Sequence, residues 1–577
     1  GSLPIAATVE PAVGSTAREV PGTLSLIGSI GTPTGDPNPV NDTVLLTTRV
    51  FGAPDLVLPW FETATTPAAA TALFAVRSPP RTEVEIGFDP ESPALPAETL
   101  GDLTLGPWAV KRVNLRDEAL ELDLAEPLTG SVGIRRTDRT DPEESGLLAG
   151  EHFQIDPGGS SASGGLLVDT ASGRSPRELC RRWSVRFLNG GPTDATTELR
   201  FWVSEVPEPP EGAPVPVVRG VVYTEAGNPV QEVTIPLAER AFVRSSTAPF
   251  DGGTLGPNLL AASGAIEWEL PVDLAGNVSA VHRVPGSFAV EVPGTCLDPP
   301  FEPRQPGRGH PLVLPYFEVA PDGRTALFAV RNEGDEEIKV RFSYHSADGD
   351  RLAAETCSLA ARAVRTVNLR EVDGSSADGE CSVEGAGDAP VELTSGFVRI
   401  QAELIQADLP DDGPSNGTEA DVFLSGDFLL VSPAEGLAAG GALVDTDPSR
   451  RPPQLCARWS TRLIHDGAGR TTELLVYADE PETGDDGWSL TGTIRDSRGI
   501  ELGRARFAAG SADRVLRVES REILERLRED GALFGTIEWS SDDGRLVHVA
   551  TRFQDANGLS ILVPGVCLEA PEPETMP

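Results

Sequence analysis

The chain has 577 residues, of which 39% are hydrophobic and 23% are charged. Because a domain usually has about 100 to 200 residues, this length excludes a single small domain, and the hydrophobic content argues against intrinsic disorder. Asp and Glu number 88 against 47 Lys and Arg, a net charge of -41, so we expect no nucleic-acid partner, because phosphates would be repelled. No apolar run reaches the roughly 18 residues that a membrane helix needs, so we expect no membrane insertion.

Residues 1–45 are a leader that is predicted to contain two strands. Gly1 and Ser2 fit either a mature end or the scar of a removed tag. Apolar residues alternate with other residues at Leu3, Ile5, Ala7 and Val9, and again at Leu24, Leu26 and Ile30. The first set is the candidate self-assembly strand. It either completes a sheet of its own domain, which needs no second molecule, or adds to the open sheet edge of another copy and so makes the chain a homopolymer.

The rest of the chain is duplicated. LVLPWFE at Leu56–Glu62 returns as LVLPYFE at Leu312–Glu318, and TALFAVR at Thr71–Arg77 returns at Thr325–Arg331. Later pairs follow in the same order, among them GGLLVDT with GGALVDT, TTELRFWV with TTELLVYA, and GAIEW with GTIEW. The differences in length lie between these blocks, as expected for loops that join strands of fixed length. The chain is therefore a leader followed by two copies.

Each copy divides again into two series of about seven short segments with alternating apolar residues. Val367 and Leu369, for example, alternate with Asn368 and Arg370. This pattern is typical of antiparallel β-sandwiches that resemble immunoglobulin-like or jelly-roll modules. We therefore predict an all-β fold of tandem sandwiches with two-fold internal duplication, in which the modules span residues 46–172, 173–300, 301–449 and 450–577.

One short helix is predicted at residues 520–531. Ser520 is a suitable N-cap, Ile523, Leu524 and Leu527 lie on one helical face, and Gly531 is a suitable end.

The six cysteines can be paired by means of the repeat. Cys180 in LCRRW matches Cys456 in LCARW, and Cys296 in VPGTCL matches Cys567 in VPGVCL. We predict Cys180 with Cys296, Cys456 with Cys567, and the remaining Cys357 with Cys381. Disulfides persist in oxidising compartments, so the protein is expected to be extracellular or at the cell surface. The alternative is six buried free thiols in a cytoplasmic protein. The spacing of the cysteines in the sequence does not match a metal site.

Catalytic motifs are nearly absent from the sequence. There is no GxGxxG, P-loop, HExxH or CxxC pattern. The segment Gly413–Gly417 fits GxSxG, but its acidic flanks do not form the strand and helix of a nucleophile elbow, so a loop is expected. We predict that the chain is not an enzyme, although a site assembled from distant loops would leave no spacing signature.

Calcium is the only cofactor that the sequence suggests. The acidic segments Asp408–Gly413 and Ser346–Asp350 could present carboxylates to Ca²⁺. Neither has the spacing of an EF-hand, and Asp-Gly is a common turn pair, so turns are the favoured interpretation.

Six tryptophans fall into two groups. Four of them recur in both copies and are predicted to be core residues, namely Trp183 with Trp459 and Trp268 with Trp539. Trp60 and Trp108 have no tryptophan at the matching place in the second copy, and they are the candidate carbohydrate contacts.

Three functions remain open. The first is a secreted, non-catalytic structural protein of the cell surface, built as a rod of four sandwiches and assembled into a filament or fibre by strand addition. The second is a surface adhesin or carbohydrate-binding protein that uses loops at the sandwich ends. The third is a hydrolase with a nonlocal site.

Overall fold

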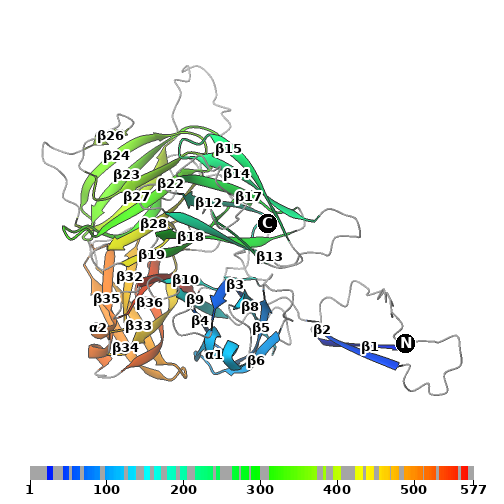
Figure 1. Ribbon diagram of the computed structural model, residues 1–577. Helices are drawn as coiled ribbons and strands as arrows, with labels where there is room; N and C mark the ends of the chain where they lie inside the picture. Colours follow the sequence, from blue (N-terminus) through cyan, green and yellow to red (C-terminus); the bar gives the residue numbers. More distant parts are fainter. Residues whose placement is uncertain are drawn as a thin grey trace, which may run out of the picture. The chain divides into compact units, whose positions relative to one another are not determined.

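The computed structural model forms two compact units, Gly1–Pro54 and Asp55–Pro577 (Figure 1). The residues it describes are 22–29, 43–50, 55–64, 71–90, 98–121, 128–137, 148–155, 162–170, 179–189, 195–203, 215–237, 242–246, 263–271, 274–284, 288–298, 311–372, 381–384, 394–403, 423–432, 437–447, 454–467, 469–479, 487–510, 513–527, 532–555 and 560–568.

The smaller unit contains a two-stranded antiparallel sheet. β1 (Gly22–Ser29) pairs with β2 (Thr43–Val50), with Gly22 opposite Val50 and Ser29 opposite Thr43. β1 confirms the strand predicted around Leu24 and Leu26. β2 belongs to the same unit, although the predicted leader ends at residue 45. The other predicted strand, with Leu3, Ile5, Ala7 and Val9, lies outside the described residues.

The larger unit consists of antiparallel sheets that pair face to face into four sandwiches, as predicted. The first sandwich packs the sheet β10-β9-β4-β7 against the sheet β11-β3-β8-β5-β6 around one apolar core. Its elements are β3 (Leu56–Thr63), β4 (Thr71–Arg77), β5 (Thr82–Pro90), β6 (Glu98–Leu105), β7 (Val110–Asn114), α1 (Leu115–Glu121), β8 (Leu128–Arg136), β9 (Ala149–Ile155), β10 (Ala162–Leu166) and β11 (Val168–Asp169).

The second sandwich packs β15-β14-β17-β12-β20 against β16-β13-β18-β19. Its strands are β12 (Arg182–Leu188), β13 (Thr196–Val203), β14 (Val217–Thr224), β15 (Pro229–Pro236), β16 (Phe242–Ser246), β17 (Ser263–Glu269), β18 (Gly276–Val284), β19 (Phe288–Pro293) and β20 (Thr295–Cys296).

The third sandwich packs β26-β24-β23-β27-β21-β30 against β25-β22-β28-β29. Its strands are β21 (Leu312–Glu318), β22 (Thr325–Asn332), β23 (Ile338–Ser346), β24 (Arg351–Leu359), β25 (Val364–Asn368), β26 (Cys381–Glu384), β27 (Ser395–Glu403), β28 (Leu424–Ser432), β29 (Leu437–Ala442) and β30 (Val444–Asp445).

The fourth sandwich packs β34-β33-β36-β31-β39 against β35-β32-β37-β38. Its elements are β31 (Arg458–His465), β32 (Thr471–Ala478), β33 (Trp488–Asp496), β34 (Glu501–Ala509), β35 (Val515–Glu519), α2 (Ser520–Leu527), β36 (Leu533–Ser541), β37 (Val547–Gln554), β38 (Ser560–Pro564) and β39 (Val566–Cys567).

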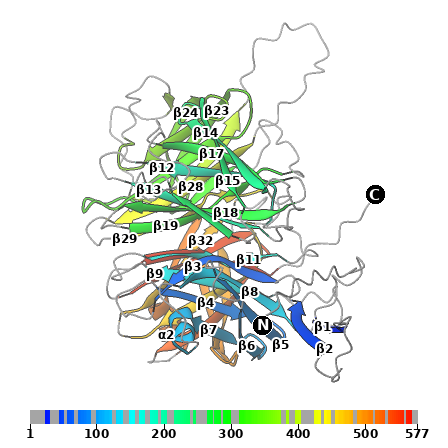
Figure 2. The same cartoon turned by 45° about the vertical axis from the view of Figure 1, so that its right-hand side comes forward.

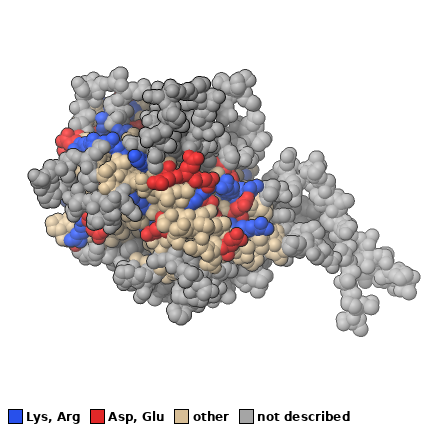
Figure 3. Space-filling view, turned by 90° about the horizontal axis from the view of Figure 1, so that it is seen from above, with Lys and Arg blue, Asp and Glu red and all other residues tan. Residues whose placement is uncertain are grey.

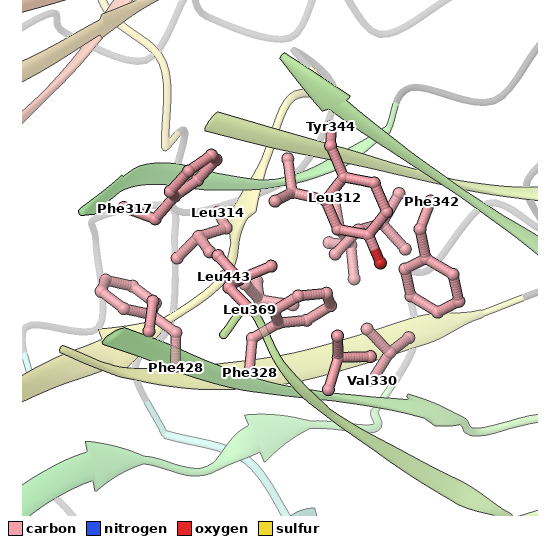
Figure 4. Packing of buried hydrophobic residues seen from close by; sticks show 14 of the residues in the cluster. Leu312, Leu314, Phe317, Phe328, Val330, Phe342, Tyr344, Leu369, Phe428 and Leu443 are labelled. Atoms are coloured by element: carbon pink, nitrogen blue, oxygen red, sulfur yellow. The ribbon is translucent and has the colours of Figure 1, made fainter. Parts of the chain in front are cut away.

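Alternation along the strands builds each core. In the third sandwich, Leu314 and Phe317 point from β21 toward Phe328 and Phe428 of the facing sheet, and all four side chains are at most 2% exposed (Figure 4). The predicted alternation near β25 is also present, since Val367 and Leu369 are buried. In this sandwich, apolar side chains from both sheets therefore supply the core between them.

Two helices occur among the described residues, although one was predicted. α2 confirms the predicted helix, and its Ile523 and Leu524 are buried. α1 was not predicted. It begins after Asn114, whose Oδ1 accepts the amide of Arg116 at 3.2 Å and whose Nδ2 donates to Asp117 at 2.8 Å, which is a capping arrangement for the helix-forming residues that follow.

Three disulfides join Cys180 with Cys296, Cys357 with Cys381, and Cys456 with Cys567, which confirms the two pairs predicted from the repeat and the pair that remained. The first and third each link the start and the end of one sandwich. Disulfides of this kind fit an oxidising compartment. In the described part of the chain, no helix has the length and apolar character needed to span a membrane.

The four sandwiches contact one another in a closed cycle, which corrects the expected rod. β10 of the first sandwich contacts β19 of the second, β19 contacts β29 of the third, β29 contacts β38 of the fourth, and β38 returns to β10. Figure 2 shows β19 beside β29. A rod requires each module to touch only its sequence neighbours, whereas here the first sandwich also packs against the fourth.

Candidate functional site

The interfaces between sandwiches hold the largest groups of buried polar side chains among the described residues. At the interface of the first and fourth sandwiches, Arg77 is 2% exposed and extends from β4. Its Nε donates to Ser460 Oγ at 2.9 Å, and its Nη1 lies 2.9 Å from Glu151 Oε2. Arg462, on β31, contacts the other oxygen of Glu151 at 3.3 Å. Glu151 is thus held between one arginine of its own sandwich and one of the fourth.

The same arrangement recurs between the second and third sandwiches. Arg331 is the repeat partner of Arg77, and it donates to Ser184 Oγ, the partner of Ser460. Arg186, the partner of Arg462, lies 2.8 Å from Asp427, the partner of Glu151. Because all four positions are equivalent, the two halves contact each other as the subunits of a two-fold symmetric dimer do.

Arg331 has further partners at this interface. Its guanidinium lies 3.0 Å from Glu267 of the second sandwich and 3.1 Å from Glu333, a carboxylate whose side chain is 0% exposed. Ser425 donates to the other oxygen of Glu333. Arginine suits such sites because its planar group can satisfy several acceptors at once.

A cavity of about 30 Å³ lies within the interface of the second and third sandwiches. Polar side chains that line it include Ser184, Arg186, His282, Arg331 and Asp427. Its volume is enough for a water molecule and too small for an organic ligand. This interface is therefore a structural contact.

His282 is fully buried beside this cavity, and its Nδ1 lies 3.0 Å from Thr197 Oγ1. Burial lowers the pKa of His282 to about 4, the carboxylate of Asp427 opposes the shift, and Arg186 adds to it. The ring is therefore neutral at physiological pH. Its position in the strand register matches Phe553 of the fourth sandwich, and His548 matches Asn277, so the two histidines are not repeat partners.

The first and second sandwiches meet around a buried carboxylate. Glu291 lies 3.1 Å from Arg200 and 3.2 Å from His152 Nε2, and it accepts a hydrogen bond from Ser279 at 2.8 Å. Burial alone would raise the pKa of Glu291, but Arg200 and His152 together with this hydrogen bond lower it to about 2. Glu291 is therefore ionised and joins β9 of the first sandwich to the second.

A cleft of about 190 Å³ opens between the third and fourth sandwiches. Its lining includes Tyr316, Glu318, Arg324, Arg517 and Arg552. The Tyr316 hydroxyl donates to Glu318 at 3.0 Å, and the guanidinium of Arg517 lies over the Tyr316 ring, 5.1 Å from its centre. Burial and the nearby Glu318 raise the pKa of this phenol, so it is a hydrogen-bond donor and not a base. The cleft offers paired charges and hydroxyl groups to a small polar ligand.

The structure corrects one predicted carbohydrate contact. Trp60 is 3% exposed and packs with Val57, Val168 and Trp202 between the first two sandwiches, beneath the guanidinium of Arg200 at 4.2 Å. A sugar cannot stack on a ring that is covered in this way, so Trp60 is a core residue. Tyr316 takes its place in the second copy, as the alignment of LVLPWFE with LVLPYFE indicates, and it is also buried.

Trp108 lies in a turn of the first sandwich that contacts the fourth. It has a φ of 60° and is partly buried, and the guanidinium of Arg495 is 5.5 Å from the ring centre. Two residues later, the amide of Val110 donates to Ser497 O at 2.9 Å. One face of this ring is therefore already covered by a neighbouring sandwich.

The four repeated tryptophans are core residues, as predicted. Trp183, Trp268, Trp459 and Trp539 are each at most 4% exposed. The Nε1 groups of Trp183 and Trp459 donate to the carbonyls of Cys180 and Cys456, so each ring is fixed beside its disulfide.

One of the two candidate calcium segments lies within the described residues. Ser346–Asp350 forms the turn between β23 and β24, in which Ser346 N donates to Asp350 O at 2.9 Å and Gly349 has a φ of 85°. Asp408–Gly413 and the GxSxG segment Gly413–Gly417 lie outside the described residues. Among the residues that the structure describes, two groups of side chains have the spacing of a metal site. Each of them contains a disulfide, so its sulfur atoms are not free to bind a metal.

Sequence reasoning missed the buried arginines and carboxylates, because charged residues are usually exposed. A signal was present in the repeat. Arg77 and Arg331 end identical apolar blocks, and Glu151 is replaced only by another acid, Asp427. A charge kept in both copies of an apolar segment indicates a buried partner.

Comparison with known proteins adds no family. No protein-family model matches the chain, and no curated protein matches it.

Proposed function

We propose that the chain is a secreted, non-catalytic structural protein of the cell surface that self-associates through strands of its leader. The observation that carries this proposal is the sheet of β1 and β2, which has two strands within the described residues and belongs to a separate compact unit. A two-stranded sheet is only marginally stable in water, and a third strand stabilises it. Strand addition to another copy supplies that third strand.

Properties of the larger unit agree with a structural role. Its four sandwiches bury apolar and charged surfaces against one another, and three disulfides support them. On the face shown in Figure 3, acidic and basic side chains are interspersed among the described residues. A rigid unit of this kind is suited to a structural role, while the leader connects one molecule to the next.

The test measures the mass of the full chain by sedimentation velocity at about 0.01 M and about 1 M salt. The net charge of -41 opposes association, so oligomers should increase with salt as the repulsion is screened. Replacing Leu45 and Leu46 of β2 by Lys places charges on the strand and should leave a monomer. The control replaces Ile500 and Leu502, which are 52% and 38% exposed, by Lys and should still assemble. A wild-type chain that stays monomeric at every salt and protein concentration would contradict the proposal.

A second candidate, carbohydrate binding by a surface adhesin, is favoured by the cleft at Tyr316. Arg324 and Glu318 at its mouth are 38% and 24% exposed and could donate to and accept from sugar hydroxyls. Binding of neutral oligosaccharides, measured by calorimetry and lost in Arg324→Ala, would support this candidate. Equal binding by the variant would remove the cleft from consideration.

A further inference from the structure

The first and third sandwiches differ at one sheet edge. In the third sandwich, β24 is covered by the additional strand β26, which pairs with it from Ala354 opposite Glu384 to Cys357 opposite Cys381. The equivalent strand of the first sandwich is β6, and within the described residues it pairs only with β5. We call the outer side of β6, Glu98–Leu105, the β6 edge. The β6 edge corresponds to the side of β24 on which β26 is added in the third sandwich.

Burial at one position shows what the added strand does. Cys357 faces the core, is 1% exposed, and is opposite Val340 of β23. Leu103 has the same place in the first sandwich, opposite Val84 of β5, and it packs on the core but is only partly buried. The β6 edge therefore leaves apolar core surface less covered than its counterpart does, and an open edge of this kind pairs readily with another strand.

The leader hairpin, β1 with β2, is a suitable occupant because each of its two strands has one edge that is unpaired in the described part of the chain. Among the residues that the structure describes, the hairpin has no third strand, and the first sandwich has an edge that can provide one. Both deficits are removed by a single strand pairing.

The short segment between β2 and β3 favours a hairpin from a second molecule over the hairpin of the same chain. Val50 ends β2 and Leu56 begins β3, so six residue steps span at most about 21 Å. The sheet order β3-β8-β5-β6 places a strand beyond the β6 edge four strand spacings from β3, which is about 19 Å. Reaching its own edge would require a fully stretched tether across the sheet, and with β1 adjacent to β6 the required span of about 24 Å exceeds the tether. A hairpin from another copy has no such restriction.

We propose that the β6 edge of one molecule accepts the leader hairpin of a second molecule. This pairing extends the five-stranded sheet of the first sandwich. This inference rests on the proposed function and names the acceptor for it. The pairing is head to tail, since each copy has one hairpin and one β6 edge, so it propagates into a chain of molecules.

Cysteine cross-linking between two separately prepared full-length variants tests this pairing. The acceptor variant carries Leu103→Cys, the position equivalent to Cys357. The donor variant carries a cysteine at one of two adjacent sites on β2, Leu45 or Leu46, or on β1, Leu26 or Ile27. Neighbouring residues of a strand face opposite sides of the sheet, so the acceptor thiol should form a linked dimer with only one site of an adjacent pair. Peptide mass spectrometry identifies the link and separates it from links between two acceptor chains.

The control acceptor carries Thr104→Cys in place of Leu103→Cys. Its side chain points to the opposite face, so it should link to the other member of each pair. If the mixture assembles but neither acceptor variant links to the leader, the β6 edge is the wrong acceptor and the proposed function survives. If there is neither assembly nor a link, both proposals fail. A link that forms only when both cysteines are in the same chain would show that the hairpin closes on its own edge and would overturn the second-copy pairing.

Discussion

Arg77 and Arg331 hold equivalent positions, and both are less than 5% exposed. A buried ion pair adds little net stability, but a buried charge without its partner is strongly unfavourable, by roughly 3 to 5 kcal/mol. Pairing the sandwiches in any other order would separate Asp427 from Arg186 and Arg331 from Glu267, although Arg331 would keep Glu333 of its own sandwich. The charges therefore specify which sandwiches meet, while the apolar clusters around them supply most of the stability.

His282 makes the stability of the chain depend on pH. Its pKa is about 4 in the folded protein and about 6.5 when unfolded, so protonation favours unfolding. Its contribution is complete above pH 6.5 and is lost as the pH falls to 4, at about 1.4 kcal/mol per pH unit. His548, whose pKa burial also lowers to about 4, acts in the same range.

Replacing His282→Phe should therefore reduce the loss of stability between pH 6.5 and 4 by up to about 3 kcal/mol. Phenylalanine is the residue at the equivalent position, Phe553, so the ring can be accommodated. The urea midpoint measured across this pH range checks the effect, and the reverse exchange Phe553→His should steepen the dependence. An unchanged pH dependence in the His282→Phe variant would contradict the assignment.

At the scale of the elements, contacts between turns of neighbouring sandwiches follow the same two-fold symmetry as the buried charges. Val110 N donates to Ser497 O at 2.9 Å and joins a turn of the first sandwich to a hairpin turn of the fourth. In the same way, Val364 N donates to Glu225 O at 2.8 Å and joins a turn of the third sandwich to a hairpin turn of the second. Each hairpin turn has a glycine with positive φ, Gly499 at 81° and Gly227 at 79°. A Cβ atom at either glycine would collide with a carbonyl oxygen of the facing turn.

Gly499→Ala should for this reason destabilise the chain more than Gly544→Ala. Gly544 has a similar φ of 76°, but a Cβ atom there would meet nothing within 4 Å. The control therefore carries only the backbone penalty of about 1 to 2 kcal/mol, and Gly499→Ala adds the steric clash. Urea unfolding measures both, and faster hydrogen exchange at Val110 should accompany Gly499→Ala alone. Equal midpoints for the two variants would show that the turns are not in close contact.

Most elements could be predicted from the sequence because their cause is local. Strands such as β22 and β25 follow from alternating apolar residues, and the cysteine pairs follow from the repeat together with the two cysteines that remain. α1 was missed because its first residues match a turn in the other copy. Asn368 Oδ1 accepts the amide of Arg370 at 3.2 Å just as Asn114 Oδ1 accepts that of Arg116, so this hydrogen bond does not distinguish the helix from the turn. The type of sandwich, immunoglobulin-like or jelly-roll, stays a prediction.

At the scale of the whole molecule, the sequence predicts four modules but not their contacts. Interface residues such as Trp60 and Glu151 are separated from their partners by 140 to 311 positions, so no spacing pattern relates them. The predicted module boundaries at residues 172, 300 and 449 stay predictions.

The two halves form an intramolecular pseudo-dimer in which the first sandwich contacts the fourth and the second contacts the third. A protease site inserted between Pro299 and His310, followed by cleavage and light scattering on a sizing column, tests it most directly, since each disulfide lies within one half. The cleaved halves should elute together with the mass of the intact chain, because the buried interfaces of Arg77 and Arg331 hold them. Separation into two species of about half the mass, with each half folded, would contradict it.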